Sequence, residues 1–147
     1  MRITLSRRGD YAVRAILALA EHEGGLGEAR GTQRGFLSTR RIADRMHIPA
    51  PFASHVLADL VRAGLVIGGA GRRGGYRLAV PPGAISILRV VDAAERAAGP
   101  PRCVLRGMPC DPDGRCAVHD TLDGATRAAR AAMDATTVAD LVPEAKR

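Results

Sequence analysis

Residues 38–79 carry the clearest local pattern in the chain and read STRRIADRMHIPAPFASHVLADLVRAGLVIGGAGRRGGYRLA. Ser38 is suited to cap a first helix, and residues 47–49 interrupt that helix. A second helix opens around Pro51, because proline is tolerated in a first turn, and Gly64 is suited to end it. The apolar positions are Ile42, Ala43 and Met46 in the first helix, and Phe52, Val56, Leu57 and Leu60 in the second. The spacing therefore predicts two short helices joined by a tight turn.

A short β-hairpin is expected directly behind these helices. Leu65–Ile67 and Tyr76–Ala79 have the composition of strands, and the Gly-rich residues 68–75 between them suit a turn. Helix, turn, helix and a Gly-tipped hairpin form the layout of a winged helix-turn-helix. The predicted fold class is mainly α with a small β-hairpin, a winged helix-turn-helix plus a long dimerisation helix.

Three more helices are expected outside this unit. Tyr11–Ala20 shows helical spacing and ends by Glu23, before a Gly-rich polar loop. Ser86–Arg96 predicts another helix, and Ala117–Ala135 predicts the last, after an irregular loop at residues 99–115. Their apolar faces are Val13, Ile16, Leu17 and Ala20; then Ile87, Val90, Val91 and Ala94; then Val118, Leu122, Ala125, Ala129, Ala132 and Met133.

Excess positive charge is confined to the first part of the chain. Residues 1–80 hold 13 Arg against 6 acidic residues, whereas residues 81–147 hold 9 basic and 9 acidic residues. We take Pro81-Pro82, which closes the hairpin unit, as the domain boundary. We expect residues 1–82 to be the winged helix-turn-helix that binds double-stranded DNA. Residues 83–147 would then hold the dimerisation helices and a cysteine-bearing loop at about residues 99–119.

DNA contacts are expected at the start of the second helix and at the hairpin tip. The N-terminal residues of such a helix enter the major groove, where bases are read through hydrogen bonds. Ser54 and His55 lie opposite the apolar side and suit this task, as they would suit a solvated surface. Arg72 and Arg73 stand between glycines, which let the backbone approach phosphates or a narrow minor groove. The candidate DNA-binding residues are Thr39, Arg40, Pro51, Ser54, His55, Arg72 and Arg73.

Composition disfavours several other classes of protein. Hydrophobic residues make up 46% and charged residues 25% of the chain, which is a globular balance. The apolar stretches are far shorter than the ~20 residues of a membrane span. The start of the chain lacks the apolar core of a signal peptide, so a cytoplasmic protein is expected. Neither a P-loop, a dinucleotide fingerprint nor a substrate cleft is indicated, so we do not expect an enzyme.

Three cysteines and a histidine follow one another as Cys103-x6-Cys110-x5-Cys116-x2-His119. In a cytoplasmic protein such residues are ligands or sensors rather than disulfides. Thiolates with a nitrogen ligand suit an iron–sulfur cluster, whereas structural zinc sites usually have cysteines two to four residues apart. Three unligated, thiol-sensing cysteines are an alternative. A small iron–sulfur electron-transfer protein is the alternative from another functional class, which the charge on residues 1–80 disfavours.

Five segments in order along the chain carry a family resemblance: MRITLSRRGDYAVRAILALA, RRIADRMHIPAPFASHVLADLVRAGLV, GRRGGYRLA, ISILRVVDA and TTVADLV. They make the chain similar to the IscR/NsrR (Rrf-two) family of bacterial transcription regulators. The longer loop Glu23–Gly35 and a first cysteine gap one residue longer than usual set this chain apart. The resemblance implies a dimeric winged-helix repressor or activator, whose long helix after Ala117 crosses its partner and whose operator is palindromic.

The same resemblance implies an iron–sulfur cluster, [2Fe-2S] or [4Fe-4S], held by Cys103, Cys110 and Cys116. One branch of the family uses an imidazole just after the third cysteine, which is the place of His119. The other uses a carboxylate on the first helix of the partner subunit, which is the place of Asp10. Imidazole and carboxylate can each complete such a site; we favour His119 and keep Asp10 as the second candidate. Redox state, nitric oxide or iron–sulfur supply would be the signal.

Overall fold

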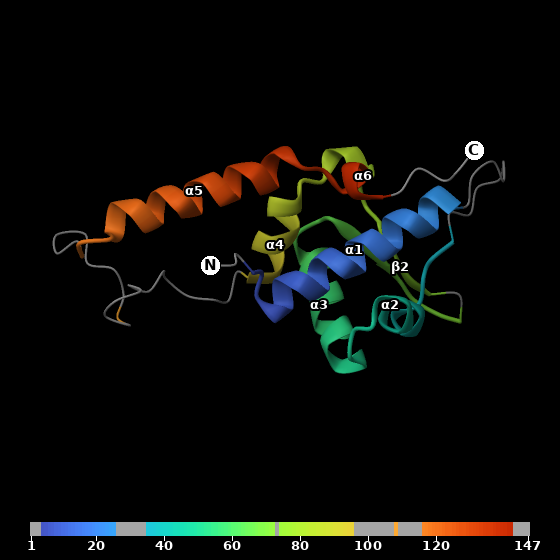
Figure 1. Cartoon of the computed structure of the whole chain (residues 1–147). Helices are drawn as coiled ribbons and strands as arrows, with labels where there is room; N and C mark the ends of the chain where they lie inside the picture. Colours follow the sequence, from blue (N-terminus) through green and yellow to red (C-terminus); the bar gives the residue numbers. More distant parts are fainter. Residues whose placement is uncertain (1–3, 26–34, 73, 96–107, 109–115, 143–147) are drawn as a thin grey trace.

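The computed structural model describes residues 4–25, 35–72, 74–95, 108 and 116–142. The elements in chain order are α1 (Arg7–Gly25), α2 (Thr39–Met46), α3 (Ala50–Arg62), β1 (Val66–Gly69), β2 (Gly75–Leu78), η1 (Pro82–Ala84), α4 (Ile87–Glu95), α5 (His119–Ala135) and α6 (Val138–Leu141). Figure 1 shows α1 running through the centre, packed on α3 and α4, while α5 reaches away from them. The predicted fold class, mainly helical with a small antiparallel sheet, is confirmed.

The helix-turn-helix is shaped by local signals that the sequence shows. The Ser38 hydroxyl accepts a hydrogen bond from the Arg41 backbone N–H at 3.3 Å and so caps α2. His47 ends α2 in the left-handed conformation, with φ 52°. After α3, Gly64 has φ 71°, and the N–H of the following residue donates to the Leu60 carbonyl at 3.0 Å. This is a Schellman ending, and it confirms the predicted end of α3.

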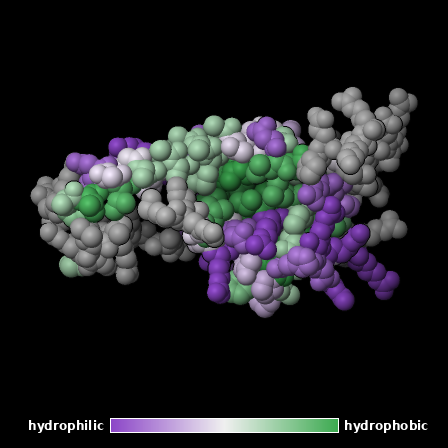
Figure 2. All heavy atoms as spheres, viewed as in Figure 1, coloured by the Kyte–Doolittle hydropathy of each residue, from purple (hydrophilic) through white to green (hydrophobic). Residues whose placement is uncertain are grey.

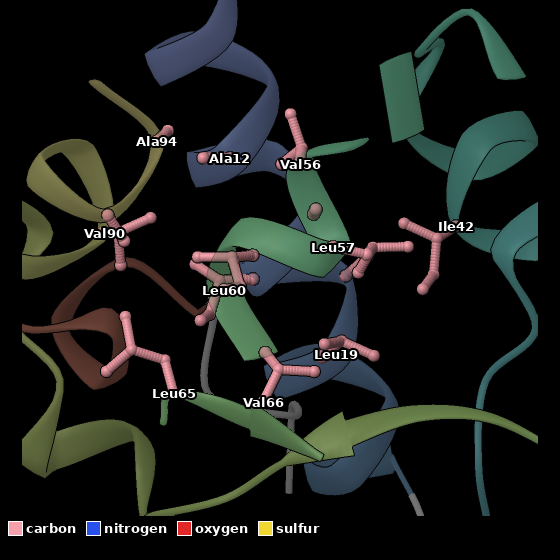
Figure 3. Close-up of a cluster of buried hydrophobic side chains, with 14 of the residues drawn as sticks. Ala12, Leu19, Ile42, Val56, Leu57, Leu60, Leu65, Val66, Val90 and Ala94 are labelled. Atoms are coloured by element: carbon pink, nitrogen blue, oxygen red, sulfur yellow. The ribbon is translucent and has the colours of Figure 1, made fainter. Parts of the chain in front are cut away.

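One hydrophobic core joins α1, α2, α3 and α4 (Figure 3). The buried positions predicted for α3 and α4 are confirmed at Val56, Leu57, Leu60, Ile87, Val90, Val91 and Ala94. The core continues past Pro81-Pro82, because it includes α4 and also Val138 of α6. The domain boundary at this dipeptide stays a prediction.

The buried side of α1 differs from the predicted stripe. Ile16 and Ala20 are buried as expected, but Val13 and Leu17 are only partly buried. The fully buried positions include Ala12, Ala15 and Leu19. Helix α1 lies between α3 and α4, and small alanines on that side allow close approach of the neighbouring helices. The observed buried side of α1 is therefore rotated about the helix axis relative to the predicted apolar side.

Phe52 was expected in the core of α3, and that expectation is wrong. Its side chain is 46% exposed, and the neighbouring Ala53 is fully buried instead. The Phe52 ring lies against Tyr11 of α1, with the ring centroids 5.6 Å apart and the planes tilted by 56°. An alanine at the buried position leaves room for α1 to pack closely, and the larger ring is placed at the edge of the contact.

The hairpin is enlarged by the chain that precedes α2. The paired residues of β1 and β2 are Val66 with Leu78, Ile67 with Arg77, Gly68 with Tyr76, and Gly69 with Gly75. Leu37 adds a bridge, because its N–H and its carbonyl each bond to Tyr76 at 2.9 Å. Gly75 has φ 149°, and a Cβ there would lie 2.4 Å from the Leu37 carbonyl oxygen. Glycine is therefore required where this segment crosses the hairpin.

The hairpin is also fastened to α1. The carboxylate of Glu23, near the end of α1, accepts a hydrogen bond from the Leu78 backbone N–H at 3.0 Å. A carboxylate acceptor makes this bond stronger than one between neutral groups. The far end of α1 thus fixes the base of the hairpin.

Hydrogen bonds and an ion pair join helix α5 to the start and the middle of the α4 segment. None of its residues is buried within the described chain. Arg130 donates to both carboxylate oxygens of Asp92 in α4, at 2.9 and 2.8 Å. This hydrogen bonding, followed by the charge of Asp92, raises the pKa of the Arg130 guanidinium. Ser86 also donates to Asp134 at 2.9 Å.

The chain returns to the core through α6. The Thr137 hydroxyl accepts from the Asp140 N–H at 3.3 Å, and the Asp140 carboxylate accepts from the Thr137 N–H at 2.8 Å. This reciprocal arrangement is a capping box. Hydrogen bonds from the Thr137 hydroxyl, and then from its backbone N–H, lower the pKa of Asp140. The Val138 N–H donates to the Ile85 carbonyl at 2.9 Å, which holds α6 beside the start of α4.

Candidate nucleic-acid interface and cysteine segment

The side of α3 that faces away from the core carries short or polar residues. Pro51 lies in its first turn, and Pro51, Ser54 and His55 are all exposed. Hydrogen-bonding side chains on an open helix surface are what reading base edges in the major groove requires. The geometry is compatible with the predicted DNA contacts.

Two arginines of α2 differ in how they are engaged. Arg40 is 91% exposed and has only a long ion pair, 3.7 Å, with Asp44. Arg45 instead donates to Glu21 of α1 at 2.7 Å, which fastens α2 to α1. Thr39, the first residue of α2, is half-buried. Arg40 is therefore suited to approach a phosphate, whereas Arg45 stabilises the helix arrangement.

The hairpin tip is a tight turn that requires glycine at several positions. Gly71 has φ 93°, and its carbonyl accepts from the Gly74 N–H at 2.9 Å. A Cβ on Gly74 would lie 2.4 Å from the Gly69 carbonyl oxygen. Arg72 is exposed at this tip, and the predicted DNA contact at Arg73 lies outside the described residues.

A further arginine lies lower on the hairpin. The Arg77 guanidinium carbon is 5.5 Å from the centroid of the Phe36 ring, within cation–π range. Sequence reasoning did not single out this pair, because the two residues lie in separate segments. The contact orders Arg77 on the same hairpin that carries Arg72.

Polar and apolar surfaces are segregated on the molecule. Figure 2 shows hydrophilic side chains gathered over the end that carries α2 and α3, and apolar side chains between α1 and α5. Helices α2 and α3 at this hydrophilic end belong to residues 1–80, which hold the excess of arginine. The hydrophilic end is the candidate nucleic-acid interface, and the apolar area is a candidate contact between subunits.

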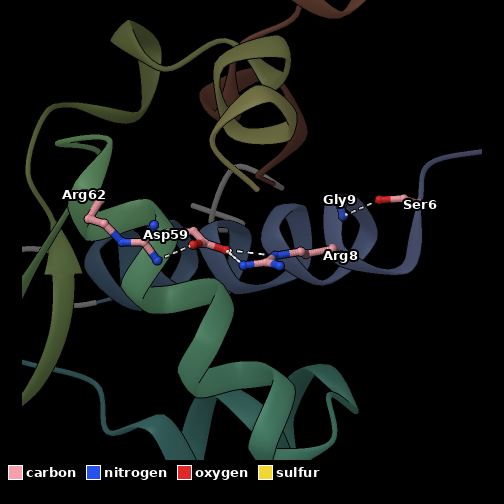
Figure 4. A network of polar contacts seen from close by, with 5 residues as sticks. All are labelled: Ser6, Arg8, Gly9, Asp59 and Arg62. Carbon is pink, nitrogen blue, oxygen red and sulfur yellow. Dashed lines mark hydrogen bonds and ion pairs between the residues drawn. The ribbon is translucent and has the colours of Figure 1, made fainter. Parts of the chain in front are cut away.

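Sequence reasoning also missed an ion pair between α1 and α3. Arg8 of α1 donates to Oδ2 of Asp59 from Nε at 2.9 Å and from Nη2 at 2.6 Å (Figure 4). Arg62 donates to the other oxygen of the same carboxylate at 2.6 Å. Only the spacing of Asp59 and Arg62, three residues apart on one helix, could have signalled a contact. Arg8 lies 51 residues away and could not be assigned from sequence.

The candidate ligand Asp10 lies in the first turn of α1. Ser6 caps this turn, because the Ser6 hydroxyl accepts a hydrogen bond from the Gly9 N–H at 3.0 Å. The Asp10 carboxylate is paired with Arg14, at 3.1 Å from Nε and 2.8 Å from Nη2. An added Cβ at Gly9 would lie 3.0 Å from Oε1 of Glu95, the last residue of α4. The first turn of α1 therefore lies beside the point where the cysteine segment leaves α4.

The described chain contains one of the three cysteines. Cys116 is half-buried, and its carbonyl accepts from the N–H of His119, the first residue of α5, at 3.0 Å. Cys103 and Cys110 lie outside the described residues. Among the described residues no three His, Cys, Asp or Glu side chains are grouped as metal ligands. The donor types present, a thiol and an imidazole, suit an iron–sulfur or zinc site.

The predicted dimerisation face lies on the exposed helix α5. Val118, Leu122, Ala129 and Met133 are half-buried, and Ala125 and Ala132 are exposed. Met133 is partly buried and packs against the hydrophobic core. Apolar residues at helical spacing thus remain half-buried or exposed in the described chain. Within the described residues, no helix combines the length and the apolar character needed to cross a bilayer.

Comparison with known proteins gives concordant matches. A model of the Rrf2 family, described as an iron-dependent transcriptional regulator, matches residues 5–144. A Rhodobacter capsulatus protein named as an rrf2-like HTH-type transcriptional regulator is 35% identical over 109 residues, which are 73% of this chain and 69% of the relative.

Two solved structures share the fold. The structure of T. potens IscR is 25% identical, with a TM-score of 0.71, and the match covers 95% of this chain and 85% of IscR. The structure of CymR, described as the global cysteine regulator of B. subtilis, is also 25% identical with a TM-score of 0.71. That match covers 95% of this chain and 96% of CymR.

Proposed function

This chain belongs to the Rrf2 family of transcriptional regulators, and we propose that it acts as a homodimeric repressor bound to a palindromic DNA operator. We infer further that an iron–sulfur cluster sets its operator affinity. Residues 1–82 would bind DNA in the cytoplasm, and residues 83–147 would dimerise and carry the cluster. The observation that carries DNA binding is the exposed polar side of α3, with Arg40 on α2 and Arg72 at the hairpin tip nearby in the same motif.

DNA binding is tested by measuring affinity as a function of salt. Arginine contacts to phosphates release counterions, so the affinity for a duplex should fall steeply as salt is added. A sequence enriched from a random DNA library should bind more tightly than a shuffled duplex of equal composition. Equal affinity for both duplexes, or no salt dependence, would contradict the proposal.

The uncovered apolar side of α5 supports the dimer. A second copy of the chain presents the same face, and small residues such as Ala125 and Ala129 allow two helices to approach closely. Val13 and Leu17 of α1 are also only partly buried, and we infer that they contribute to the same contact. The two α3 helices of a dimer would reach half-sites about one helical turn, ~34 Å, apart. A small rotation between subunits would therefore change operator affinity.

The cysteine spacing and the family description support the iron–sulfur cluster. Cys103, Cys110 and Cys116 would supply thiolates, and His119 or the partner's Asp10 would complete the ligand set. A [2Fe-2S] or [4Fe-4S] cluster bound there would supply chemistry sensitive to oxidation and nitric oxide. The proximity of Cys116 and His119 at the start of α5 favours the imidazole. The position of Asp10 near the end of α4 keeps the carboxylate as a candidate.

Purification without oxygen, followed by absorption spectroscopy and assays of iron and sulfide, tests the cluster directly. His119→Ala and Asp10→Ala, made separately, then test the fourth ligand. We expect His119→Ala to lose or alter the cluster spectrum and Asp10→Ala to retain it. The reverse result would assign the carboxylate, and two unchanged spectra would exclude both residues.

A cluster-free, thiol-dependent regulator is the second candidate. It is favoured by the similarity to CymR, described as a global cysteine regulator. In that case the anaerobically purified protein would contain neither iron nor sulfide, and oxidation of its thiols would change its affinity for DNA. Zinc without sulfide would indicate a zinc-dependent regulator instead.

A further inference from the structure

Helix α3 carries a buried carboxylate on the side that faces α1. The Asp59 side chain is 3% exposed, and both of its oxygens accept hydrogen bonds from arginines (Figure 4). The two arginine side chains, however, are 45% and 72% exposed, and ion pairs with such solvent-exposed partners contribute little net stability. Stability alone is therefore a weak reason for a charged residue at this position.

The two arginines bind one carboxylate but connect different parts of the fold. Arg62 lies on α3 itself, so its contact at 2.6 Å stays within one helix. Arg8 lies on α1, and its Nε and Nη2 both donate to Oδ2, at 2.9 and 2.6 Å. The planar guanidinium restricts the direction of these bonds as well as their length. Arg8, and not Arg62, therefore constrains the rotation of α3 relative to α1.

Rotation of α3 matters because its exposed side carries the candidate base contacts Ser54 and His55. A side chain lies about 5 Å from the helix axis, so a rotation of ~20° moves it by about 2 Å. That displacement exceeds what a hydrogen bond to a base edge tolerates. The close-packed core contacts of α3 prevent large rotations, and the directed bonds of Arg8 help to fix the final orientation of the helix.

We propose that Arg8 is a positioning residue, which orients α3 through Asp59 and so contributes to discrimination between DNA sequences. This inference rests on the proposed DNA-binding function. It assigns Arg8 a role that requires no contact between Arg8 and DNA. Arg62, which binds the same carboxylate, has no such role.

The test compares Arg8→Lys with Arg62→Lys in the full chain. Both variants keep the positive charge, but lysine cannot make the two directed bonds of Arg8. The probes are a duplex enriched by the unmodified protein from a random library and a shuffled duplex of equal composition. We expect Arg8→Lys to reduce the ratio of the two affinities about tenfold, a change comparable to one mismatched base pair. Arg62→Lys should leave the ratio unchanged.

Other outcomes would overturn the inference. An equal reduction of the ratio by both lysine variants would show that discrimination does not depend on the contact between α1 and α3. If Arg8→Ala weakens both duplexes alike and reduces the salt slope by about one, Arg8 contacts a phosphate instead. Should Arg8→Lys fail to fold, the double variant Arg8→Met/Asp59→Leu replaces the ion pair by apolar contact, and it should fold yet lose discrimination. If the unmodified protein enriches no sequence, the proposed function itself fails.

Discussion

Helices α3 and α5 are both amphipathic, but their apolar sides meet different surroundings. In α3 the apolar side is buried against α1, α4 and β1, and even the charged Asp59 is enclosed. In α5, which is longer, no residue is buried by the described chain. The position of α3 is therefore determined within one subunit, whereas α5 leaves apolar residues half-buried or exposed, which we propose a second subunit covers. On this proposal, α3 is positioned by contacts within one chain, and α5 by association with a second copy.

The sharpest test of this difference removes the same side chain from each helix. Leu60→Ala should lower the free energy of unfolding by about 2–5 kcal/mol, because Leu60 is fully buried in the core. Leu122→Ala should have a much smaller effect on the fold, since Leu122 is only half-buried. Its effect should grow with protein concentration if a dimer covers it. Urea denaturation at two protein concentrations measures the unfolding free energy of both variants. Equal losses of unfolding free energy in the two variants, at both concentrations, would contradict the difference between α3 and α5.

A charge placed on the exposed face of α5 should break association without breaking the fold. We expect Ala129→Arg to give monomers and to lower operator affinity by about a hundredfold, because a monomer engages one half-site. Ala131→Arg, at an exposed position on the opposite side of the same helix, is the matched control. Light scattering and DNA titration report the two effects. A dimeric Ala129→Arg variant would show that subunits meet elsewhere.

Substitutions in the hairpin and in α3 should have smaller and different effects on DNA binding. Arg72→Ala/Arg73→Ala should weaken all duplexes together, about tenfold, and reduce the slope of affinity against salt by about one to two. Ser54→Ala or His55→Ala should instead change the preferred base at one position. Binding titrations at several salt concentrations test both. Unchanged affinity of the double arginine variant for operator and random DNA would exclude the hairpin as a contact.

The smallest effect concerns the capping box that returns the chain to the core after α5. The pKa of Asp140 lies below its ordinary value of 3.8, so its stabilising contribution is present above pH 3.8. That contribution is lost as the pH falls through the lowered pKa. Thr137→Val should reduce the melting temperature by a few degrees at neutral pH and by less in acid. Thr136→Val is the control, because the Thr136 hydroxyl donates to the Ala132 carbonyl and not to a carboxylate. Its effect on the melting temperature should be the same at neutral and at acid pH.

Local signals made much of the fold predictable. The Ser38 cap, the end of α3 at Gly64 and the presence of the hairpin depend on residues close in sequence, and the structure has them. The strand bounds differ from those expected, because β1 (Val66–Gly69) and β2 (Gly75–Leu78) extend into the Gly-rich residues predicted as the turn. The buried side of α1 and the exposed Phe52 were not predictable in the same way. They depend on which neighbouring helix α1 approaches, and a single helix pattern does not contain that information.

In the candidate site, too, features set by local sequence were predictable and contacts between distant segments were not. Exposure of Ser54, His55 and Arg72 follows from helix periodicity and turn composition. The pairing of Arg8 with Asp59 joins residues far apart in sequence, so no spacing rule indicates it. The ligand set is still a prediction, because Cys103 and Cys110 lie outside the described residues.

The hairpin has a consequence for protein engineering. It is not an independent module, since Leu37 pairs with Tyr76, and Glu23 bonds to the backbone of Leu78. A chimera that transplants only residues 66–78 into a relative would leave those two partners behind. A successful graft would have to carry three segments that are separate in the gene, or find equivalents of Glu23 and Leu37 in the recipient.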